Sequence, residues 1–374
     1  MNSVLFVQNA THRAGAQTCL VRLVSHARAR LWHPVILCSC PGWLTEECER
    51  RGIQYLVEPF PRSRSIVSRL IFNTGFARTV KKRLDQLSIR PTIVQANDHW
   101  EGLLGVHLAH TLSARSAIFL RTSRITRKQY YKYQCDRYDV IACAGAALQE
   151  RIQLWEKRKQ IALFIDGIEE ADFLPPREKT QNAPKRLLVI GAQRSSKGWA
   201  DLVEALSIQA RFGKWLPEQV DFTGEAPSPT ENDLKLQRIP KVRFQFLGHT
   251  NHFRELVRKY DLVINPSRID SFGMAAVETL AAGVPLLSSR TGVLEQIIDD
   301  EYMLFPPEKP EALAEALNFV ITNWNDLDFA IMTAQENISR RFSVSQSVDT
   351  VDRLYRQLRS DIVQVDEATT VGSI

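Results

Sequence analysis

The sequence predicts an α/β protein built from two doubly wound, Rossmann-like domains. Its 374 residues suffice for two domains of the usual size, about 100 to 200 residues each. Apolar residues make up 44% of the chain, and their short runs alternate with amphipathic helical stretches, which favours parallel sheets covered by helices. We find no apolar run of the roughly 18 residues that would span a bilayer, and residues 3–7 predict a first strand rather than a leader peptide. We therefore expect a cytoplasmic protein.

The apolar runs predict the strands of each domain in chain order. For the first domain, residues 1–165, the predicted strands lie near 3–7, 34–38, 93–96, 117–120 and 139–142. For the second domain, residues 166–345, they lie near 187–190, 219–223, 242–247, 261–264 and 284–288. Residues 346–362 predict one more helix, and residues 363–374 predict a flexible tail.

The segment over residues 261–295 combines these elements with charged side chains. An apolar strand ends at Asn265-Pro-Ser, and after a glycine turn a helix-forming run follows and ends at Gly283. Backbone N–H groups at the start of such a helix attract anionic phosphates. Asp270 in the loop and Glu278 on the helix are eight residues apart, so each carboxylate reaches a different part of one elongated ligand. This arrangement indicates sugar-nucleotide chemistry.

This carboxylate pair resembles the carboxylate-x7-carboxylate signature of family 4 glycosyltransferases, which are retaining enzymes of the GT-B fold. Further segments resemble motifs of that family, and they cover residues 165–168 with Phe173, 191–198, 221–225 and 244–248. The resemblance implies the GT-B architecture, in which two Rossmann-like domains face a central cleft. It also implies that the helix over 346–362 crosses back to the first domain.

The resemblance implies three catalytic residues. Asp270 would bind hydroxyls of the donor sugar and steady its positive charge, Glu278 would hold the ribose diol, and Lys197 would neutralise the leaving diphosphate. The leaving phosphate would deprotonate the acceptor, so we name no protein nucleophile. No metal or other cofactor is expected, and the six cysteines show neither a CxxC pair nor a spacing typical of zinc. The family usually has Glu where this chain has Asp270, and Arg where it has Ala192.

A wider set of residues would bind the donor. Arg194, two residues after Ala192, either supplies the missing guanidinium or faces solvent. Gly15, in the glycine-bearing loop after the first strand, would let the backbone approach the donor phosphate. Together with these two, the predicted donor-binding residues are Lys197, Ser271, Phe272, Gly273, Met274 and Glu278.

Positive charge is concentrated in the first part of the chain. Residues 1–165 hold 25 Lys and Arg against 11 Asp and Glu, a net charge of +14, whereas residues 166–374 hold 23 against 31, a net charge of −8. The basic run over 62–83 carries apolar residues at helical spacing. It would either lie on an anionic membrane surface or pack on the sheet with its cations in water.

A second basic run, residues 121–133, interleaves cations with aromatic side chains. It follows a predicted strand, so it would border the cleft and hold an acidic or phosphorylated acceptor. Nucleic-acid binders also show this pattern, but we expect no nucleic-acid partner. His99 has a structural hydrogen bond as its alternative role. The predicted acceptor residues are His12, Asn97, His99, Arg121 and Arg124.

We therefore expect a retaining, metal-independent, hexosyltransferase-like enzyme that moves a sugar from a nucleotide-diphosphate sugar to a hydroxyl acceptor. The acceptor would be a glycan or lipid-linked saccharide in bacterial cell-envelope synthesis, as in lipopolysaccharide, O-antigen or exopolysaccharide, at the inner face of the membrane. One alternative is a transferase with a small-molecule acceptor, or another nucleotide-sugar enzyme of the same fold. A second alternative is a non-catalytic GT-B-like binding subunit, which Ala192 and Asp270 suggest.

Overall fold

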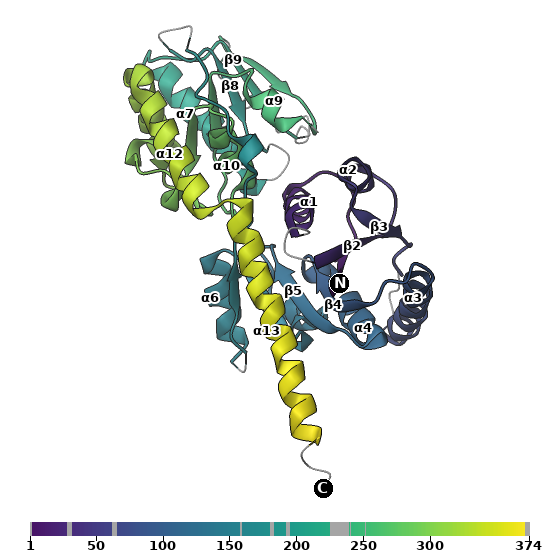
Figure 1. The fold of residues 1–374 in the computed structure, drawn as a ribbon. Helices are drawn as coiled ribbons and strands as arrows, with labels where there is room; N and C mark the ends of the chain where they lie inside the picture. The colour runs from purple at the N-terminus through teal and green to yellow at the C-terminus, as the bar shows by residue number, and fades with distance from the viewer. Residues whose placement is uncertain are drawn as a thin grey trace. The chain divides into compact units, whose positions relative to one another are not determined.

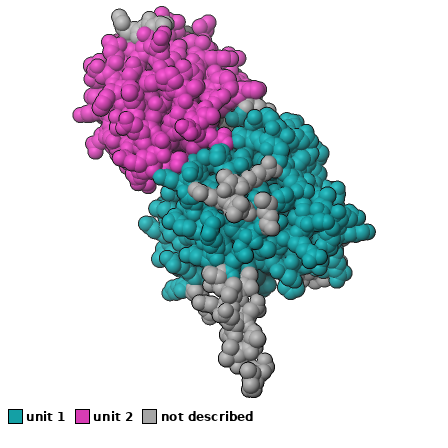
Figure 2. All heavy atoms as spheres, viewed as in Figure 1, with its two compact units in different colours: residues 1–167, 344–374 teal, residues 168–343 magenta. Residues whose placement is uncertain are grey.

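The chain divides into two compact units. The computed structural model describes residues 2–27, 32–61, 66–157, 159–179, 183–191, 195–224, 239, 241–250 and 252–370, without the side chains of 66–72 and 360–370. Unit 1 comprises residues 1–167 and 344–374, and unit 2 comprises residues 168–343 (Figure 2, teal and magenta). The predicted domains ran over 1–165 and 166–345, with the last helix assigned to the first domain.

The described part of unit 1 is built on a seven-stranded parallel sheet, in the order β3-β2-β1-β4-β5-β6-β7. Side chains on both faces of its central strands are buried, which is why these strands read as continuous apolar runs. The sequence predicted five of the strands and missed the short β3 and β7. The strands are β1 Asn2–Gln8, β2 Trp32–Cys38, β3 Gln54–Val57, β4 Pro91–Ala96, β5 Arg115–Leu120, β6 Val140–Ala144 and β7 Ala162–Phe164.

Helices cover both faces of this sheet (Figure 1). One face packs against α1 (Gly15–Ala27), α2 (Trp43–Arg51) and α13 (Val344–Thr370). The other face packs against α3 (Ile66–Gln86), α4 (Gly102–Leu112), α5 (Arg127–Lys132) and α6 (Ala146–Trp155). Two short 3-10 helices, His99–Glu101 and Cys135–Arg137, lie in the connecting loops.

Helix α13 belongs to unit 1, although unit 2 precedes it in the chain. Its Tyr355 ring packs edge-on against Trp32, with the ring centroids 5.1 Å apart, and the Tyr355 hydroxyl donates to the Gln95 side chain. The indole N–H of Trp32 donates to Asp352 Oδ1 at 2.7 Å. The helix runs to Thr370, whereas the sequence predicted a flexible tail from residue 363. No glycine or proline interrupts the sequence before Gly372, and the helix therefore continues.

The basic helix α3 packs on the sheet. Ala77, Val80 and Leu84 recur at helical spacing and are buried in the core of unit 1, whereas Arg78, Lys81, Lys82 and Arg83 are exposed. These described side chains match the packing alternative of the sequence analysis, and the start of the basic run, 62–65, lies outside the described residues. Among the residues that the structure describes, no helix is both long and apolar enough to cross a membrane.

The described part of unit 2 holds a six-stranded parallel sheet, in the order β10-β9-β8-β11-β12-β13. Its strands are β8 Arg186–Val189, β9 Gln219–Phe222, β10 Arg243–Phe246, β11 Leu262–Asn265, β12 Leu286–Ser289 and β13 Leu304–Phe305. Its helices are α7 Trp199–Arg211, α9 Phe253–Val257, α10 Met274–Ala281, α11 Pro310–Thr322 and α12 Leu327–Arg341. Its 3-10 helices are Glu170–Asp172, Ser195–Lys197, Leu294–Gln296, Glu301–Met303 and Trp324–Asp326. The predicted α/β fold class with two doubly wound, Rossmann-like sheets is confirmed.

Both sheets reverse their strand order near the middle, between β1 and β4 in unit 1 and between β8 and β11 in unit 2. In open parallel sheets, ligands bind outside the carboxyl ends of the strands at such a reversal. The loops that follow β1, β4, β8 and β11 carry most of the residues that the sequence analysis selected. A ligand site is therefore expected at these two carboxyl edges.

Candidate functional site

An ion pair lies at the carboxyl edge of the unit 2 sheet. Lys197 ends the 3-10 helix Ser195–Lys197 after β8, and Asp270 lies in the loop after β11. The Lys197 Nζ is 2.7 Å from Asp270 Oδ1 and donates to Ser267 Oγ at 3.3 Å. The two side chains are 31% and 17% exposed, so water and ligands can reach the pair. The structure thus brings two of the three predicted catalytic residues into direct contact.

Arg268 ties together the two loops that carry this pair. Its backbone N–H donates to Ser196 O at 2.8 Å, and its guanidinium donates to both carboxylate oxygens of Asp201, at 3.0 and 2.7 Å. Hydrogen bonding to Asp201 raises the pKa of Arg268, which keeps it charged. Gly198 lets the loop after β8 approach the loop after β11 closely, because a Cβ atom at this position would lie 1.9 Å from Pro266 O. Its φ of +64° is also one that favours glycine. Arg268 was not among the residues predicted from the sequence, although it lies two residues before Asp270.

A network of buried side chains supports the loop after β11. Asn265 Nδ2 donates to Ser288 Oγ at 2.9 Å, and Ser267 Oγ donates to Asn265 Oδ1 at 2.9 Å. The Ser289 hydroxyl donates to Ser267 O at 2.5 Å. All four side chains are buried, and their polar groups have hydrogen-bond partners. They hold Ser267 in place, and its hydroxyl accepts from Lys197. The Asn-Pro-Ser sequence therefore serves local structure beneath the site.

Gly191 makes room for the lysine stem on the other side. It has a φ of +74°, and a Cβ atom there would lie 3.0 Å from Lys197 Cγ. Its N–H donates to Thr223 Oγ1 at 2.8 Å, which anchors the start of the loop. Arg194 and Ala192 lie outside the described residues, so the donor role of Arg194 stays a prediction.

The segment 271–274 leads into α10. Gly273 is the N-cap residue with a φ of +91°, and the first turn of α10 starts at Met274. The loop after β12 holds this segment, because Val293 N–H donates to Phe272 O at 3.1 Å. Helix N-termini carry N–H groups without intrahelical partners, which favours an anion beside them. Glu278 lies on the same helix, half-buried, and the roles of Ser271 to Met274 and of Glu278 stay predictions.

The carboxyl edge of unit 1 buries its charges instead. Arg121 donates to both Asp166 oxygens, at 3.2 and 2.9 Å, and to Asn97 O at 2.9 Å. Asn97 in turn donates to the Gln8 side chain. Arg121, Asp166 and Asn97 are all buried, so their named contacts hold the strands of unit 1 together. The acceptor roles of Asn97 and Arg121 stay predictions, with these polar atoms already engaged inside the unit.

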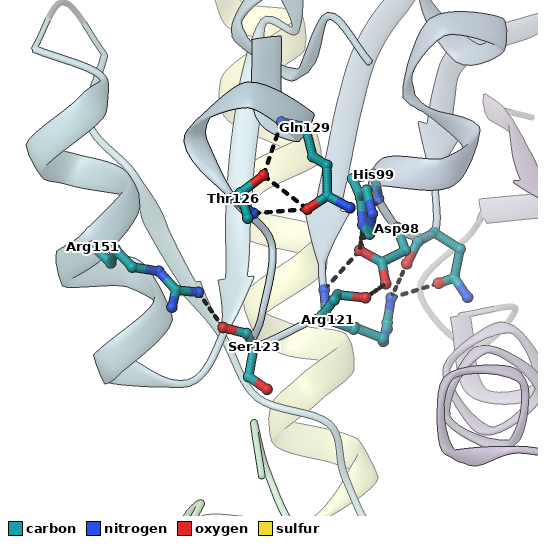
Figure 3. A network of polar contacts seen from close by, with 9 residues as sticks. Asp98, His99, Arg121, Ser123, Thr126, Gln129 and Arg151 are labelled. Atoms are coloured by element: carbon teal, nitrogen blue, oxygen red, sulfur yellow. Dashed lines mark hydrogen bonds and ion pairs between the residues drawn. The ribbon is translucent and has the colours of Figure 1, made fainter. Parts of the chain in front are cut away.

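Asp98 organises the loop after β4. Figure 3 shows it beside His99 and Arg121, and it accepts from the His99 N–H at 2.7 Å, the Thr122 hydroxyl at 2.5 Å and the Arg121 N–H at 3.2 Å. Burial opposes its charge, but the bonds from His99 and Thr122 outweigh burial and lower the pKa of Asp98. His99 Nδ1 lies 3.1 Å from the same carboxylate. Among the described residues, its Nε2 has no hydrogen-bond partner and is buried.

Further arginine and loop contacts extend this region (Figure 3). Thr126 and Gln129 cap α5 reciprocally, and Arg151 of α6 donates to Ser123 O. Three remaining predicted residues are exposed: His12 in the loop after β1, Gly15 at the first turn of α1, and Arg124 in the loop after β5. Their roles stay predictions.

Glu101 is a buried acid that the sequence analysis did not select. Its Oε1 accepts from the Asn9 N–H at 2.9 Å, and its Oε2 has no partner among the described residues. Burial, with the nearby charge of Asp98, raises the pKa of Glu101 to about 8. The acid therefore carries a proton at neutral pH and pins the loop after β1. Among the described residues no three His, Cys, Asp or Glu side chains gather as a metal site would require.

The comparison with known families covers the candidate site of unit 2. Residues 183–323 match the family model described as glycosyl transferases group 1. This range contains Lys197, Asp270 and Glu278. Over these residues the chain is similar to the group 1 glycosyltransferases. The family resemblance of the sequence analysis is thereby confirmed.

Similar proteins extend the comparison to most of the chain. An uncharacterized glycosyltransferase of Methanocaldococcus jannaschii is 24% identical over 256 residues, which are 66% of this chain and 68% of that protein. A GDP-mannose-dependent α-(1-6)-phosphatidylinositol dimannoside mannosyltransferase of Mycobacterium tuberculosis is 24% identical over 267 residues, 66% of this chain and 68% of the relative. The crystal structure of Anabaena HepE in complex with UDP and glucose superposes with a TM-score of 0.77 at 16% identity, covering 96% of this chain and 100% of HepE. The fold of this chain is GT-B.

Proposed function

We propose that this chain is a retaining glycosyltransferase that moves a sugar from a nucleotide-diphosphate sugar to a hydroxyl acceptor. The observation that carries the proposal is the Lys197–Asp270 ion pair, 2.7 Å apart and open to solvent at the reversal point of the unit 2 sheet. It lies within the range that matches the family. The names of the relatives support a nucleotide-sugar donor, because HepE was crystallised with UDP and the mycobacterial enzyme is GDP-mannose-dependent.

In this proposal, donor binding rearranges the ion pair. Lys197 exchanges Asp270 for the donor diphosphate, and the N–H groups at the start of α10 add to the neutralisation of its charge. Asp270 then accepts hydrogen bonds from sugar hydroxyls and steadies the positive charge that develops at the anomeric carbon. Glu278 holds the ribose diol from the same helix. No step is assigned to a metal ion.

The transfer step needs no nucleophile from the protein. The bond between the anomeric carbon and the phosphate oxygen breaks, and its electron pair leaves with the nucleoside diphosphate. The acceptor hydroxyl oxygen bonds to the same carbon on the same face, and its proton passes to the departing phosphate. The configuration at the anomeric carbon is therefore retained. Lys197 stabilises the negative charge that accumulates on the leaving group.

We propose that the acceptor is a bacterial cell-envelope glycan or lipid-linked saccharide, reached at the cytoplasmic face of the membrane. The net charge of +14 over residues 1–165 supports contact with anionic lipid, as does a shallow hollow lined by Arg78, Lys81, Lys82, Asp85 and Gln86. The buried face of α3 is used by the sheet, so this contact is electrostatic rather than an insertion. By its name, the mycobacterial relative glycosylates a phosphatidylinositol mannoside.

Vesicle binding tests the membrane part of the proposal. We expect the chain to bind phosphatidylserine vesicles at low salt, and to bind them less as salt rises or when Arg78, Lys81 and Lys82 are changed to Glu. Sedimentation with vesicles measures this. Donor turnover without any vesicle binding would contradict membrane contact and favour a small-molecule acceptor.

A thermal-shift screen tests the donor site. We expect UDP, GDP, ADP, TDP or CDP, or one of their sugars, to raise the melting temperature, because a ligand that binds the folded state stabilises it. Lys197→Ala and Glu278→Ala should remove the shift. The matched control is Lys185→Ala, because Lys185 pairs with Glu218 on the exposed surface of the same unit.

Donor hydrolysis and transfer then distinguish catalysis from binding. We expect turnover of the responding donor to fall by about 10²- to 10³-fold in Lys197→Ala, the usual effect of losing a group that stabilises transition-state charge. Binding of a nucleotide without turnover would favour the non-catalytic alternative. A chain that responds to none of the nucleotides would contradict the proposed donor site.

A further inference from the structure

We propose that Trp100 is a stacking platform for a saccharide ring that carries an anionic group, with Lys132 as the cation beside it. The inference deepens the proposed function, since it names the class of acceptor that unit 1 would recognise. The stacking site itself is defined by contacts within unit 1 alone. Trp100, His99 and Tyr133 are called the aromatic platform below.

In the aromatic platform, the Trp100 ring faces solvent and packs against the rings of His99 and Tyr133. Trp100 is 55% exposed, whereas His99 beneath it is fully buried. The Trp100 ring centroid lies 4.4 Å from that of His99 and 5.5 Å from that of Tyr133, and the His99 and Tyr133 centroids are 5.4 Å apart. The indole is thus packed from within, and its remaining surface faces water.

The backbone beneath the platform is held rigidly. Asp98 caps the 3-10 helix His99–Glu101 by accepting from the His99 N–H, and it also binds the Thr122 hydroxyl. On the other side of this helix, Glu101 accepts from the Asn9 N–H. A ring fixed in advance loses little conformational freedom when a ligand stacks on it, so the stacking energy is retained as affinity.

The position of the platform suits a ligand site. The 3-10 helix that carries Trp100 directly follows β4, at the carboxyl edge where the unit 1 sheet reverses its strand order. The faces of sugar rings bear C–H groups, which pack on the π-face of an indole while the hydroxyls stay in water. A half-exposed tryptophan with polar surroundings fits a sugar ring.

Charge beside the platform favours an anionic sugar. The Lys132 Nζ lies 5.5 Å from the Tyr133 ring centroid, the same distance that separates Tyr133 from Trp100. Lys132, Arg124 and Arg127 are exposed on the same segment. Of the acids near the platform, Glu101 has a raised pKa that keeps it protonated at neutral pH, whereas Asp98 has a lowered pKa and is ionised. The Asp98 carboxylate accepts from three donors within unit 1, and its single charge stands against the three exposed cations.

A lipid surface is the competing partner for an exposed tryptophan beside cations. Interfacial insertion needs several apolar side chains together. The exposed residues of segment 121–133 are Arg124, Thr126, Arg127, Lys128, Tyr131 and Lys132, so most of them are cationic. The one exposed aromatic ring among them, Tyr131, packs against Tyr130 and donates its hydroxyl to Trp155 O at 3.0 Å, and the exposed Leu154 comes from a different helix, α6. The geometry therefore favours a saccharide over a bilayer.

The test measures binding of defined sugars to the full chain. The probes are glucose 6-phosphate, glucose and inorganic phosphate, followed by calorimetry and by saturation transfer from the protein to the sugar ring protons. All measurements are repeated in Lys197→Ala, so that a phosphate bound at the unit 2 site does not contribute. We expect glucose 6-phosphate to bind more tightly than either glucose or phosphate in both proteins.

Substitutions then locate the binding. Trp100→Ala should weaken glucose 6-phosphate roughly tenfold and remove the saturation transfer, whereas Trp100→Phe, which keeps an aromatic face, should preserve most of both. Lys132→Ala should weaken glucose 6-phosphate but not glucose. The matched surface control is Leu154→Ala, because Leu154 is 75% exposed on α6, and it should change nothing.

Two outcomes would overturn the inference. One is unchanged binding of glucose 6-phosphate in Trp100→Ala. The other is sugar binding that is absent altogether, with phosphatidylserine vesicles bound by the wild type and lost in Trp100→Ala, which would make Trp100 a membrane contact. A chain that binds glucose 6-phosphate through Trp100 but responds to no nucleotide would keep this site and contradict the proposed function.

Discussion

The carboxyl edges of the two sheets use charged residues in opposite ways. In unit 2, Lys197 and Asp270 form an ion pair that solvent reaches, and Arg268 holds the loops around it. In unit 1, the corresponding edge buries Arg121 against Asp166 and keeps both from water. The difference teaches that a basic residue after a strand is not by itself a ligand site. Its exposure decides whether its charge is available.

The same comparison separates two kinds of recognition. The open ion pair of unit 2 is suited to an anion that replaces one partner, as the diphosphate of a donor would. The buried network of unit 1 is committed to structure, so recognition there falls to the exposed ring of Trp100. We therefore expect substitutions in the buried network of unit 1 to change stability, and those at Trp100 or at the ion pair of unit 2 to change ligand binding.

The largest expected effect is on the stability of unit 1. Asp166→Ala leaves the Arg121 guanidinium buried without its bidentate carboxylate, and we expect a loss of about 3–5 kcal/mol. Hydrogen exchange of β4 and β5 measures this loss locally.

Two variants bracket that result. Asp166→Asn keeps an acceptor oxygen for Arg121 and should cost less. Glu218→Ala removes an exposed partner of Lys185 in unit 2 and should cost at most about 1 kcal/mol. Equal effects of Asp166→Ala and Glu218→Ala would break the contrast between the buried and the open edge.

The next effect depends on pH and comes from Glu101. Its pKa is about 8 in the folded chain, above its ordinary value of 4.5, so between these values the folded state holds a proton that the unfolded chain has released. Stability therefore falls as pH rises through this window and is level above it. Glu101→Gln stays neutral, so its free energy of unfolding relative to the wild type should rise by about 1.4 kcal/mol per pH unit within the window.

Melting temperatures measured across the window and one unit above it test this expectation. Glu150→Gln is the control, because Glu150 is exposed on α6 and should show no such pH dependence. A difference between Glu101→Gln and the wild type that does not change with pH would show that Glu101 is ionised in the folded chain.

The smallest effect is expected at Arg268. Arg268→Ala should lower donor turnover by about fivefold with little change in melting temperature, because its partly exposed pair with Asp201 contributes at most about 1 kcal/mol. Arg268→Lys should not restore turnover, since a lysine cannot bind both carboxylate oxygens.

The control for Arg268 is Arg211→Ala, which breaks an exposed pair with Glu204 on α7. It should leave turnover unchanged. A loss of turnover in Arg268→Ala that is matched by unfolding of unit 2 would show that Arg268 supports the fold rather than the positions of Lys197 and Asp270.

Much of the fold and part of the site were predictable from local patterns. Apolar runs marked ten of the strands, whereas β3, β7 and β13, which lie at the edges of their sheets, escaped. The sequence predicted a flexible tail from residue 363, where α13 continues to Thr370. The family resemblance selected Lys197 and Asp270, and each follows a strand at the same edge of the sheet.

The residues that escaped prediction are those whose role depends on a distant partner. Arg268 was overlooked because Asp201 lies 67 residues away. Glu101 was overlooked because its pKa follows from burial against Asn9 and Asp98, which no local pattern reveals. Trp100 was overlooked because its exposure is set by how His99 and Tyr133 pack beneath it.

The amino-acid sequence by itself determined the α/β class, the order of the principal strands, and the loops that carry the charged motifs, because these depend on residues near one another in the chain. Only the tertiary structure decided which charges are available. Arg121 and Lys197 both follow strands of a parallel sheet, but one is buried against Asp166 and the other lies open beside Asp270. The cost of removing a charge from water depends on the surrounding atoms, and folding brings those atoms from distant parts of the chain.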